Sequence, residues 1–404
     1  QNNLRVGSFL EREEGLFIQP REPDRTKAFL GHLFLRLEAQ SYFFENAIEF
    51  IDSPGEWYLR TPTEEVFYRA REGEDLSQAT VIAPHLEELI EMRGTAGRPV
   101  HHLALIGLTF EYAGWMQPSE EGFVVTQADA IYHNTTPSAG RVAAAVNIAH
   151  AHHVRLERNT FQQLGGTGLT LHTDVTDVQV IGNRFRDLSG SGIVIDSLLK
   201  PHPLDPRLVC QDILIANNLI TDIGLDYRSS VGIFAGFVSN TSIEHNEIHN
   251  VPYTGISVGW GWTDADTLLG PNRIIGNRIF LVMTTMADGA GIYTLSKQSG
   301  TIIQNNYIYD ILRSPWAGNA PISAIYLDEG STGITLANNV LEHVPLGIFL
   351  HRASGNTIVN TIGTYEERWG ARNNTFNLEP DHSLDGVKLQ AGLEPSYRDL
   401  HSLE

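Results

Sequence analysis

The sequence has little that would cross-link the chain or attract an anionic partner. Its 404 residues include one cysteine, Cys210, which excludes an internal disulfide framework. Only four lysines occur, and 28 basic residues face 48 acidic ones, for a formal net charge of −20. Such a surface repels nucleic acid and anionic membranes, so we expect neither as a partner. No run of about 18 apolar residues is present to span a bilayer.

The second half of the chain lacks amphipathic helical patterns and instead repeats two short units. The first unit is apolar-x-x-Asn-x-apolar, centred on Asn159, Asn183, Asn218, Asn246, Asn277, Asn306 and Asn339. These asparagines are 24 to 35 residues apart, which is the period of a solenoid. Asparagines at turns stack, bond to neighbouring backbone and tolerate left-handed conformations. We therefore predict a structural role for them.

The second unit is a strand pattern, usually Gly-apolar-x-apolar-x. The residue after the glycine position is aliphatic in every copy: Leu169, Ile193, Ile233, Ile256, Ile292, Ile325 and Ile348. Alternation with period two, without intervening amphipathic helices, argues against βαβ units. Stacking such strands at about 4.8 Å per coil gives an all-β fold, the right-handed parallel β-helix, with aliphatic columns inside.

The rest of the chain divides around this repeat. Residues 1–100 are expected to form an N-terminal segment packed on the solenoid, with a short helix within 40–52 and a β-hairpin over 54–75. Residues 101–361 are predicted to be the catalytic β-helix domain, and residues 362–404 a C-terminal strand and cap. The chain begins at Gln1 and shows no signal peptide, so we expect a processed protein that is secreted or periplasmic in a bacterium.

The positions that alternate with the aliphatic column are expected to point outward and form a sugar-binding surface. Small residues at Gly236, Ser257 and Gly259 would make a flat floor, flanked by Trp260 and Trp262. The following coils add polar and aromatic groups, namely Tyr293, Tyr326, Asp328 and His351. Sugars stack their C–H faces on aromatic rings and hydrogen-bond at their edges, so a carbohydrate is the predicted substrate.

Structural interpretations of the same residues stay open. The tryptophans are also compatible with packing under a long loop, the tyrosines with a stacked ladder, and Asp328 and His351 with a simple ion pair. His245 and His249 have the i, i+4 spacing of a helical zinc pair, but that spacing has no such meaning on a strand. We predict no metal and no cofactor, and the sequence does not predict an oligomeric state.

Several stretches resemble a known family. "TGISVGWGW", "DGAGIYTLSKQSGTIIQNNYIYD" and "AIYLDEGSTGITLANNVL" are similar to the β-helix proteins around glycoside hydrolase family 141, as are "ENAIEFIDSPGEWYL" and "AGLEPSYRDL". The resemblance covers roughly residues 40 to 400. It implies α-L-fucosidase or xylanase activity on a plant or microbial poly- or oligosaccharide. It also implies two catalytic aspartates, which match Asp288 and Asp328.

Glycoside hydrolysis needs two carboxyl groups about 5 to 9.5 Å apart. On straight neighbouring strands Asp288 and Asp328 would be about 20 Å apart at about 3.3 Å per residue. The interval from Asn277 to Gly291 is longer than usual, so we expect a bulge that folds Asp288 back toward the surface. Three residues remain as alternative partners for Asp328: Glu329, Asp264 and Asp266.

Two roles follow as hypotheses. Asp328, expected beside His351 and Tyr326, suits the nucleophile or base, because hydrogen-bonding neighbours favour an ionised carboxylate. Asp288, among apolar residues such as Met283 and Met286, suits the acid, because such surroundings raise the pKa of a carboxyl group. Glu329 and Ser257 are included among the predicted substrate-binding residues.

Two other functions remain as alternatives. A polysaccharide lyase or uronate epimerase neutralises the carboxylate of a uronate with Ca²⁺ or with arginine or lysine side chains. The small number of lysines in this chain disfavours both enzymes. A non-catalytic carbohydrate-binding β-helix would bind sugar without either aspartate.

Overall fold

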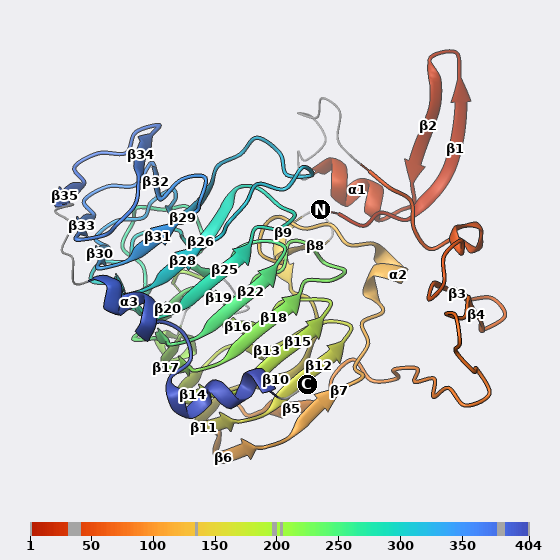
Figure 1. Cartoon of the computed structure of the whole chain (residues 1–404), viewed down its shortest axis with the longest axis horizontal. Helices are drawn as coiled ribbons and strands as arrows, with labels where there is room; N and C mark the ends of the chain where they lie inside the picture. The colour runs from red at the N-terminus through yellow and green to blue at the C-terminus, as the bar shows by residue number, and fades with distance from the viewer. Residues whose placement is uncertain are drawn as a thin grey trace.

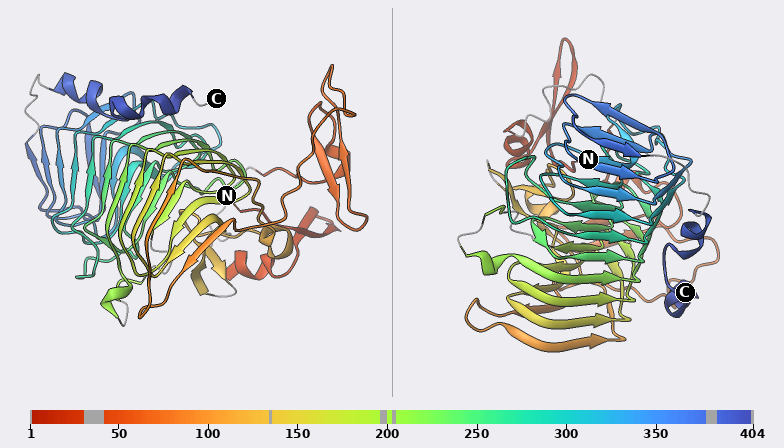
Figure 2. Two further views of the ribbon diagram at one scale, coloured as in Figure 1. Left: turned by 90° about the horizontal axis from the view of Figure 1, so that it is seen from below. Right: turned by 90° about the vertical axis from the view of Figure 1, so that its left-hand side faces the viewer.

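The protein is a stack of coils, each made of short parallel strands (Figures 1 and 2). The computed structural model describes residues 2–30, 42–133, 136–195, 200–202, 205–377 and 384–402. Successive strands of the chain go to three different sheets, and each strand pairs with its equivalents in the coils before and after it. This topology is the predicted parallel β-helix.

The three sheets run the length of the stack. Sheet one contains β5 (Ile90–Arg93), β10 (Ala144–Ala149), β13 (Thr167–Leu171), β16 (Ile193–Ile195), β19 (Ile233–Ala235), β23 (Ile256–Val258), β26 (Gly289–Thr294), β29 (Ile322–Leu327), β32 (Ile348–His351) and β34 (Tyr365–Arg368). Sheet two contains β6 (Val100–Ile106), β11 (Ala151–Glu157), β14 (Val175–Ile181), β17 (Cys210–Ala216), β21 (Ser242–Glu244), β24 (Arg273–Ile275), β27 (Ile302–Gln304), β30 (Thr335–Ala337), β33 (Thr357–Val359) and β35 (Thr375–Asn377), with β20 (Val238–Ser239) beside β17. Sheet three contains β7 (Thr109–Glu111), β12 (Thr160–Leu164), β15 (Arg184–Leu188), β18 (Leu219–Ile223), β22 (Glu247–Val251), β25 (Arg278–Val282), β28 (Tyr307–Tyr309) and β31 (Val340–Glu342).

The aliphatic column of sheet one fills the interior. Leu169 pairs in register with Ile193, and the column continues to Ile348 through one aliphatic residue per coil. All its members are at most 1% exposed. Burial of a branched aliphatic side chain contributes about 1.5–3 kcal/mol, so this column is a main source of stability. The stacked strands extend beyond both limits of the predicted domain 101–361, from Ile90 to Asn377. The repeat pattern did not reveal these terminal coils because they lack the glycine position.

The repeated asparagines form a buried ladder between sheets two and three. The Oδ1 atom of Asn277 accepts from the backbone N–H and from the Nδ2 of Asn246, at 3.0 Å each. Its own Nδ2 donates to Ile243 O at 2.9 Å and to the Oδ1 of Asn306 at 3.0 Å. The same pattern joins the seven asparagines from Asn159 to Asn339, as their structural role predicts.

We expect Asn277→Ala to lower the free energy of unfolding by about 3–4 kcal/mol. The change leaves two donors of Asn246 and the carbonyl of Ile243 buried without these partners, and each such group costs about 1–3 kcal/mol. Urea unfolding followed by circular dichroism measures the effect. Asn319→Ala, at an exposed position, is the control, with an expected change under about 0.5 kcal/mol. Equal effects of the two variants would contradict a structural ladder.

The N-terminal region forms small elements beside the stack. It contains the hairpin β1 (Val6–Arg12) and β2 (Gly15–Pro20), helix α1 (Asp24–Leu30), the 3₁₀ turn η1 (Ile48–Phe50), and the hairpin β3 (Trp57–Arg60) and β4 (Glu65–Tyr68). The second hairpin is the predicted one, with Trp57 opposite Tyr68. The helix expected within 40–52 is reduced to η1 in the described part of that segment.

A second segment, residues 115–143 between β7 and β10, is called the insert. It contains α2 (Gln117–Glu121), β8 (Ile131–His133) and β9 (Thr136–Gly140). Its buried Asp129 accepts hydrogen bonds from Ser191, Ser229 and Ser230, which lie in the turns shortly before β16 and β19 of sheet one. The insert is thereby fixed against the outer side of sheet one.

The C-terminal segment lies along the outside of the stack. After η2 (Pro206–Leu208) the solenoid continues to β35, and helix α3 (Asp385–Gln390) and η4 (Pro395–Ser402) then run back across earlier coils (Figure 2). Glu394 exchanges two hydrogen bonds of 2.9 Å with Asn217. For residues 362–404 the sequence predicts a strand and a cap; the described residues contain β34 and β35, and the part after β35 is a strap over earlier coils. In the described residues, no helix has the length and apolar character needed to cross a bilayer.

Candidate active site

Asp328 follows β29 directly and is held at both carboxylate oxygens. Its Oδ1 lies 2.6 Å from Nδ1 of His351, and its Oδ2 accepts a hydrogen bond from the hydroxyl of Tyr293. Parallel register places Tyr293 one coil before Tyr326, and His351 ends the strand of the next coil. Burial, and next the charge of Asp328, raise the pKa of Tyr293 well above its usual range, so this phenol stays a donor. A carboxylate that accepts at both oxygens is positioned to act as a nucleophile or base.

Asp288 lies just before β26, where the chain folds back toward the same face. Its backbone has φ +64°, and its N–H donates to Pro321 O at 3.0 Å. Two effects raise the pKa of Asp288 to about 6: first the loss of hydration, and second the negative charge of Asp328. The charge of His351 and a hydrogen bond from Tyr326 lower it and offset part of this rise. The residue nonetheless remains open to solvent. A reachable carboxyl group with a raised pKa is suited to donate a proton.

Tyr326 and Tyr253 connect the two aspartates. The negative charges of both aspartates act on Tyr326, and burial raises its pKa above the usual range, so it remains protonated. The Tyr253 hydroxyl donates to Asp288 O at 2.5 Å, and Gln127 of the insert donates to that hydroxyl at 3.0 Å. Tyr253 and Gln127 were not predicted, because both lie outside the repeated columns. Residues 283–288 between β25 and β26 contain bends and no strand, and the negative charge of Asp328 acts on Asp288 at the end of this segment.

The outward column of sheet one is not the open floor that the sequence suggested. Ser257 is 4% exposed, and Trp260 is 6% exposed. Trp260 packs on Phe234 with ring centroids 5.9 Å apart, and the Arg141 guanidinium of the insert lies 3.9 Å from the centre of the Phe234 ring. Gly259 is required by the backbone, since a Cβ there would lie 2.0 Å from Leu295 O. The prediction of an exposed floor is wrong because the insert covers this part of the sheet.

The accessible aromatic surface begins at Trp262, two residues after the buried Trp260. Trp262 is 42% exposed and lines a hollow of about 400 Å³ together with Glu329, Asp264, Arg372 and Trp369. Glu329 follows Asp328 directly and forms an ion pair with Arg352. Asp266 instead points to solvent and pairs with Lys297 at 2.8 Å, outside this set of lining residues.

Trp369 is a further residue of this surface that the sequence did not indicate. Its ring lies 5.0 Å from that of His351, nearly perpendicular, so it connects the hollow to the hydrogen-bonded partner of Asp328. Trp369 belongs to the segment after residue 361, for which the sequence predicts only a strand and a cap. The sequence "RWG" around it matches neither of the two repeated units. The only indication of a sugar contact in the sequence is the tryptophan itself.

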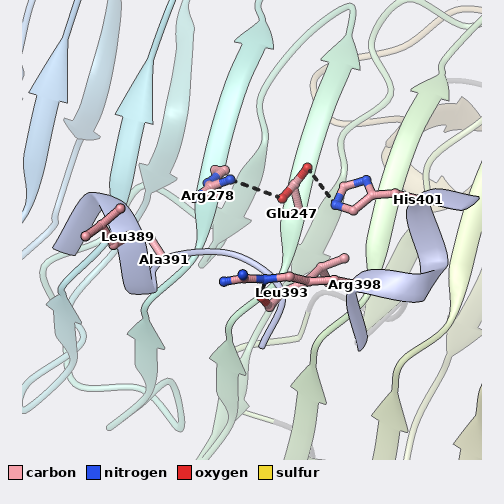
Figure 3. A pocket seen from close by; sticks show the side chains of 7 residues that line it. All are labelled: Glu247, Arg278, Leu389, Ala391, Leu393, Arg398 and His401. Carbon is pink, nitrogen blue, oxygen red and sulfur yellow. Dashed lines mark hydrogen bonds and ion pairs between the residues drawn. The ribbon is translucent and has the colours of Figure 1, made fainter. Parts of the chain in front are cut away.

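A second hollow, of about 280 Å³, lies under the C-terminal strap (Figure 3). Its carboxylate, Glu247, is placed between Arg278 at 3.8 Å and His401 at 3.6 Å. Among its lining residues no second carboxyl group is present, so it lacks the acid pair of the first surface. No cluster of three or more metal-ligating side chains occurs in the described residues.

Comparison with known proteins agrees with the topology. Residues 208–363 match the family described as right handed beta helix region. A solved glycoside hydrolase structure is 32% identical with a TM-score of 0.81, over 98% of this chain and 69% of that chain. Two structures of PfbA, a surface adhesin of Streptococcus pneumoniae, are each 14% identical, with TM-scores of 0.38 and 0.35; the matches cover 73% and 74% of this chain and 77% and 82% of those chains. No curated protein matches the chain.

The protein is thus a right-handed parallel β-helix with two coupled carboxyl groups on one face. The chain belongs to the same family as the glycoside hydrolase that it matches over nearly its whole length.

Proposed function

We propose that this protein is a glycoside hydrolase whose catalytic pair is Asp288 and Asp328. The observation that carries the proposal is the contrast between the two carboxyl groups. Asp288 has a pKa raised to about 6 and is open to solvent, whereas Asp328 is buried and accepts hydrogen bonds at both oxygens. A pair with opposite environments provides the acid and the base or nucleophile that glycoside cleavage requires. The family relationship to a glycoside hydrolase supports the same reaction.

In the proposed reaction, Asp288 donates its proton to the glycosidic oxygen as the bond breaks. Asp328 supplies its negative charge at the sugar carbon, either directly or through a water molecule. Tyr293 and His351 fix the position of Asp328, so little reorganisation is needed when charge develops. Tyr326, on which the charges of both carboxylates act, stays protonated and can donate a hydrogen bond beside them.

The substrate is proposed to be a xylan- or fucoside-type saccharide, on the resemblance to glycoside hydrolase family 141. Trp262 and Trp369 provide indole surfaces next to Glu329, the residue after Asp328, and the hollow that they line also has charged and hydroxyl groups. Ser257 and Trp260 are buried, so direct contact with the sugar is assigned to Trp262, Trp369 and His351.

A panel of aryl glycosides tests the proposal. Wild-type protein and Asp328→Asn are assayed on α-L-fucosyl, β-D-xylosyl and α-D-galactosyl aryl glycosides and on xylan. We expect hydrolysis of a fucoside or xyloside by the wild type only. Release of an unsaturated uronide from an acidic polysaccharide would assign a lyase instead. Sugar binding without cleavage, unchanged in Asp328→Asn, would assign a binding module.

The pH profile reports on Asp288. The acid must be protonated, and above its pKa of about 6 the protonated fraction falls about tenfold per pH unit. We therefore expect kcat/KM of the wild type to decline with that slope on the alkaline side of about pH 6. Initial rates between pH 4 and 9 at constant ionic strength measure it. A profile that stays flat through pH 8 would contradict Asp288 as the proton donor.

A further inference from the structure

The proposed site is closed on one side along the stack. The insert reaches across sheet one at β19 and β23, where Arg141 stacks on Phe234 at 3.9 Å and lies 5.7 Å from the centre of the Trp260 ring. Beneath them the outward residues Val194, Phe234 and Ser257 are each at most 4% exposed. A saccharide cannot lie on sheet one there, because protein already covers the surface.

The insert, which covers the closed side, is linked to Asp288 by hydrogen bonds. Gln127 of the insert binds Tyr253, and Tyr253 binds the backbone of Asp288. Asp129 anchors the insert through three serine hydroxyls at 2.6 to 2.7 Å. The covering segment is therefore a fixed part of the site.

The opposite side of the acid pair is open. Going from β29 toward β34, the chain presents the hollow of about 400 Å³ that begins at Glu329, the residue after Asp328. Trp369, on the last coil of sheet one, is 60% exposed, and Trp262 at the near edge is 42% exposed. Exposed indoles beside a polar hollow are a suitable surface for a pyranose ring.

From this asymmetry we infer that the protein removes sugars from the ends of saccharide chains, holding the terminal unit at Asp288 and Asp328 and the adjoining unit between Trp262 and Trp369. The inference rests on the proposed function. An open groove on both sides would admit the interior of a polymer, whereas a site with one wall accepts only a chain end. The insert defines the covered side, and Trp262 and Trp369 define the open side. Substitutions can therefore change one side without the other.

Product analysis tests the mode of cleavage. The probes are β-1,4-xylopentaose and a fucosylated pentasaccharide, each labelled at its reducing end with 2-aminobenzamide. Early in the reaction we expect one monosaccharide and one tetrasaccharide as the only products, and the position of the label shows which end was cut. Labelled disaccharide and trisaccharide at the same early times would overturn chain-end action while leaving glycoside hydrolysis intact. A wild type that cleaves no aryl glycoside and no pentasaccharide would remove the proposed function and this inference with it.

Trp369→Ala tests the open side. We expect KM for the pentasaccharide to rise about five- to tenfold, since one aromatic stacking surface is lost, and KM for the aryl monosaccharide to rise clearly less. Trp369→Phe should restore most of the affinity. Trp57→Ala is the matched control, because Trp57 is 66% exposed on the β3–β4 hairpin, far from β32 and β34 (Figure 1), and should change neither value. Equal effects of Trp369→Ala on both substrates would show that the hollow does not hold the adjoining sugar.

Discussion

Replacing Asp328 with asparagine is expected to lower kcat by about 10³- to 10⁴-fold on the aryl glycoside that the wild type cleaves best. The substitution keeps the shape of the side chain and removes its charge. A catalytic base or nucleophile contributes an effect of this size, equivalent to about 4 to 5.5 kcal/mol of transition-state stabilisation. KM should change little, because the lost negative charge stabilises the transition state much more than it stabilises the bound substrate.

The Asp328→Asn variant needs a control for folding and for loss of an Asp–His pair. Asp310 offers one, since it lies 3.1 Å from His343 at an exposed turn after β28, on sheet three. Asp310→Asn removes a comparable pair outside the site and should leave kcat unchanged. Both variants should retain the wild-type circular dichroism spectrum. A folded Asp328→Asn protein with more than about a tenth of wild-type kcat would exclude Asp328 from the chemistry.

Replacing Asp288 with asparagine is expected to have an effect that depends on the leaving group. For a sugar or alkyl leaving group, loss of the proton donor should lower kcat/KM by about 10²- to 10⁴-fold. A dinitrophenolate leaves without protonation, so its glycoside should lose only about tenfold or less. The decline of activity above about pH 6 should also disappear in this variant. Steady-state kinetics on the two classes of substrate measure the contrast.

Asp222→Asn is the matched control for this experiment. Asp222 has φ +51° near the end of β18 in sheet three, close to the φ of Asp288, and asparagine tolerates this conformation in both places. The control should behave as the wild type on both substrates. Equal losses in Asp288→Asn for activated and unactivated leaving groups would assign Asp288 to positioning and leave the proton donor to another group, such as Glu329.

The sequence predicted the architecture because a solenoid is built from local, repeated interactions. The position of Ile256 in its coil is decided by Ile233 and Ile292, its neighbours in register, and the same period fixes every other member of the column. Asn246 and Asn277 likewise bond only to adjacent coils. The contact of Asp328 with His351 followed from the same register, because the two residues stand at equivalent positions in consecutive coils.

The sequence did not predict which outward residues are accessible. Ser257 and Trp260 have the pattern of a surface, but the insert, more than 100 residues earlier in the chain, covers them through Arg141. Contacts between the insert and sheet one do not recur from coil to coil, so the repeat pattern of the sequence cannot predict them. Trp369 and Tyr253 were missed for the same reason, since each reaches the site from a turn outside the columns.

By itself, therefore, the sequence determined the coil, its core and the register that aligns Tyr293, Tyr326 and Asp328, because each coil is specified by its nearest neighbours. The tertiary structure alone decided where a sugar has access. The raised pKa of Asp288, the covered side at Phe234 and the open side at Trp369 all arise from segments distant in sequence that meet in space.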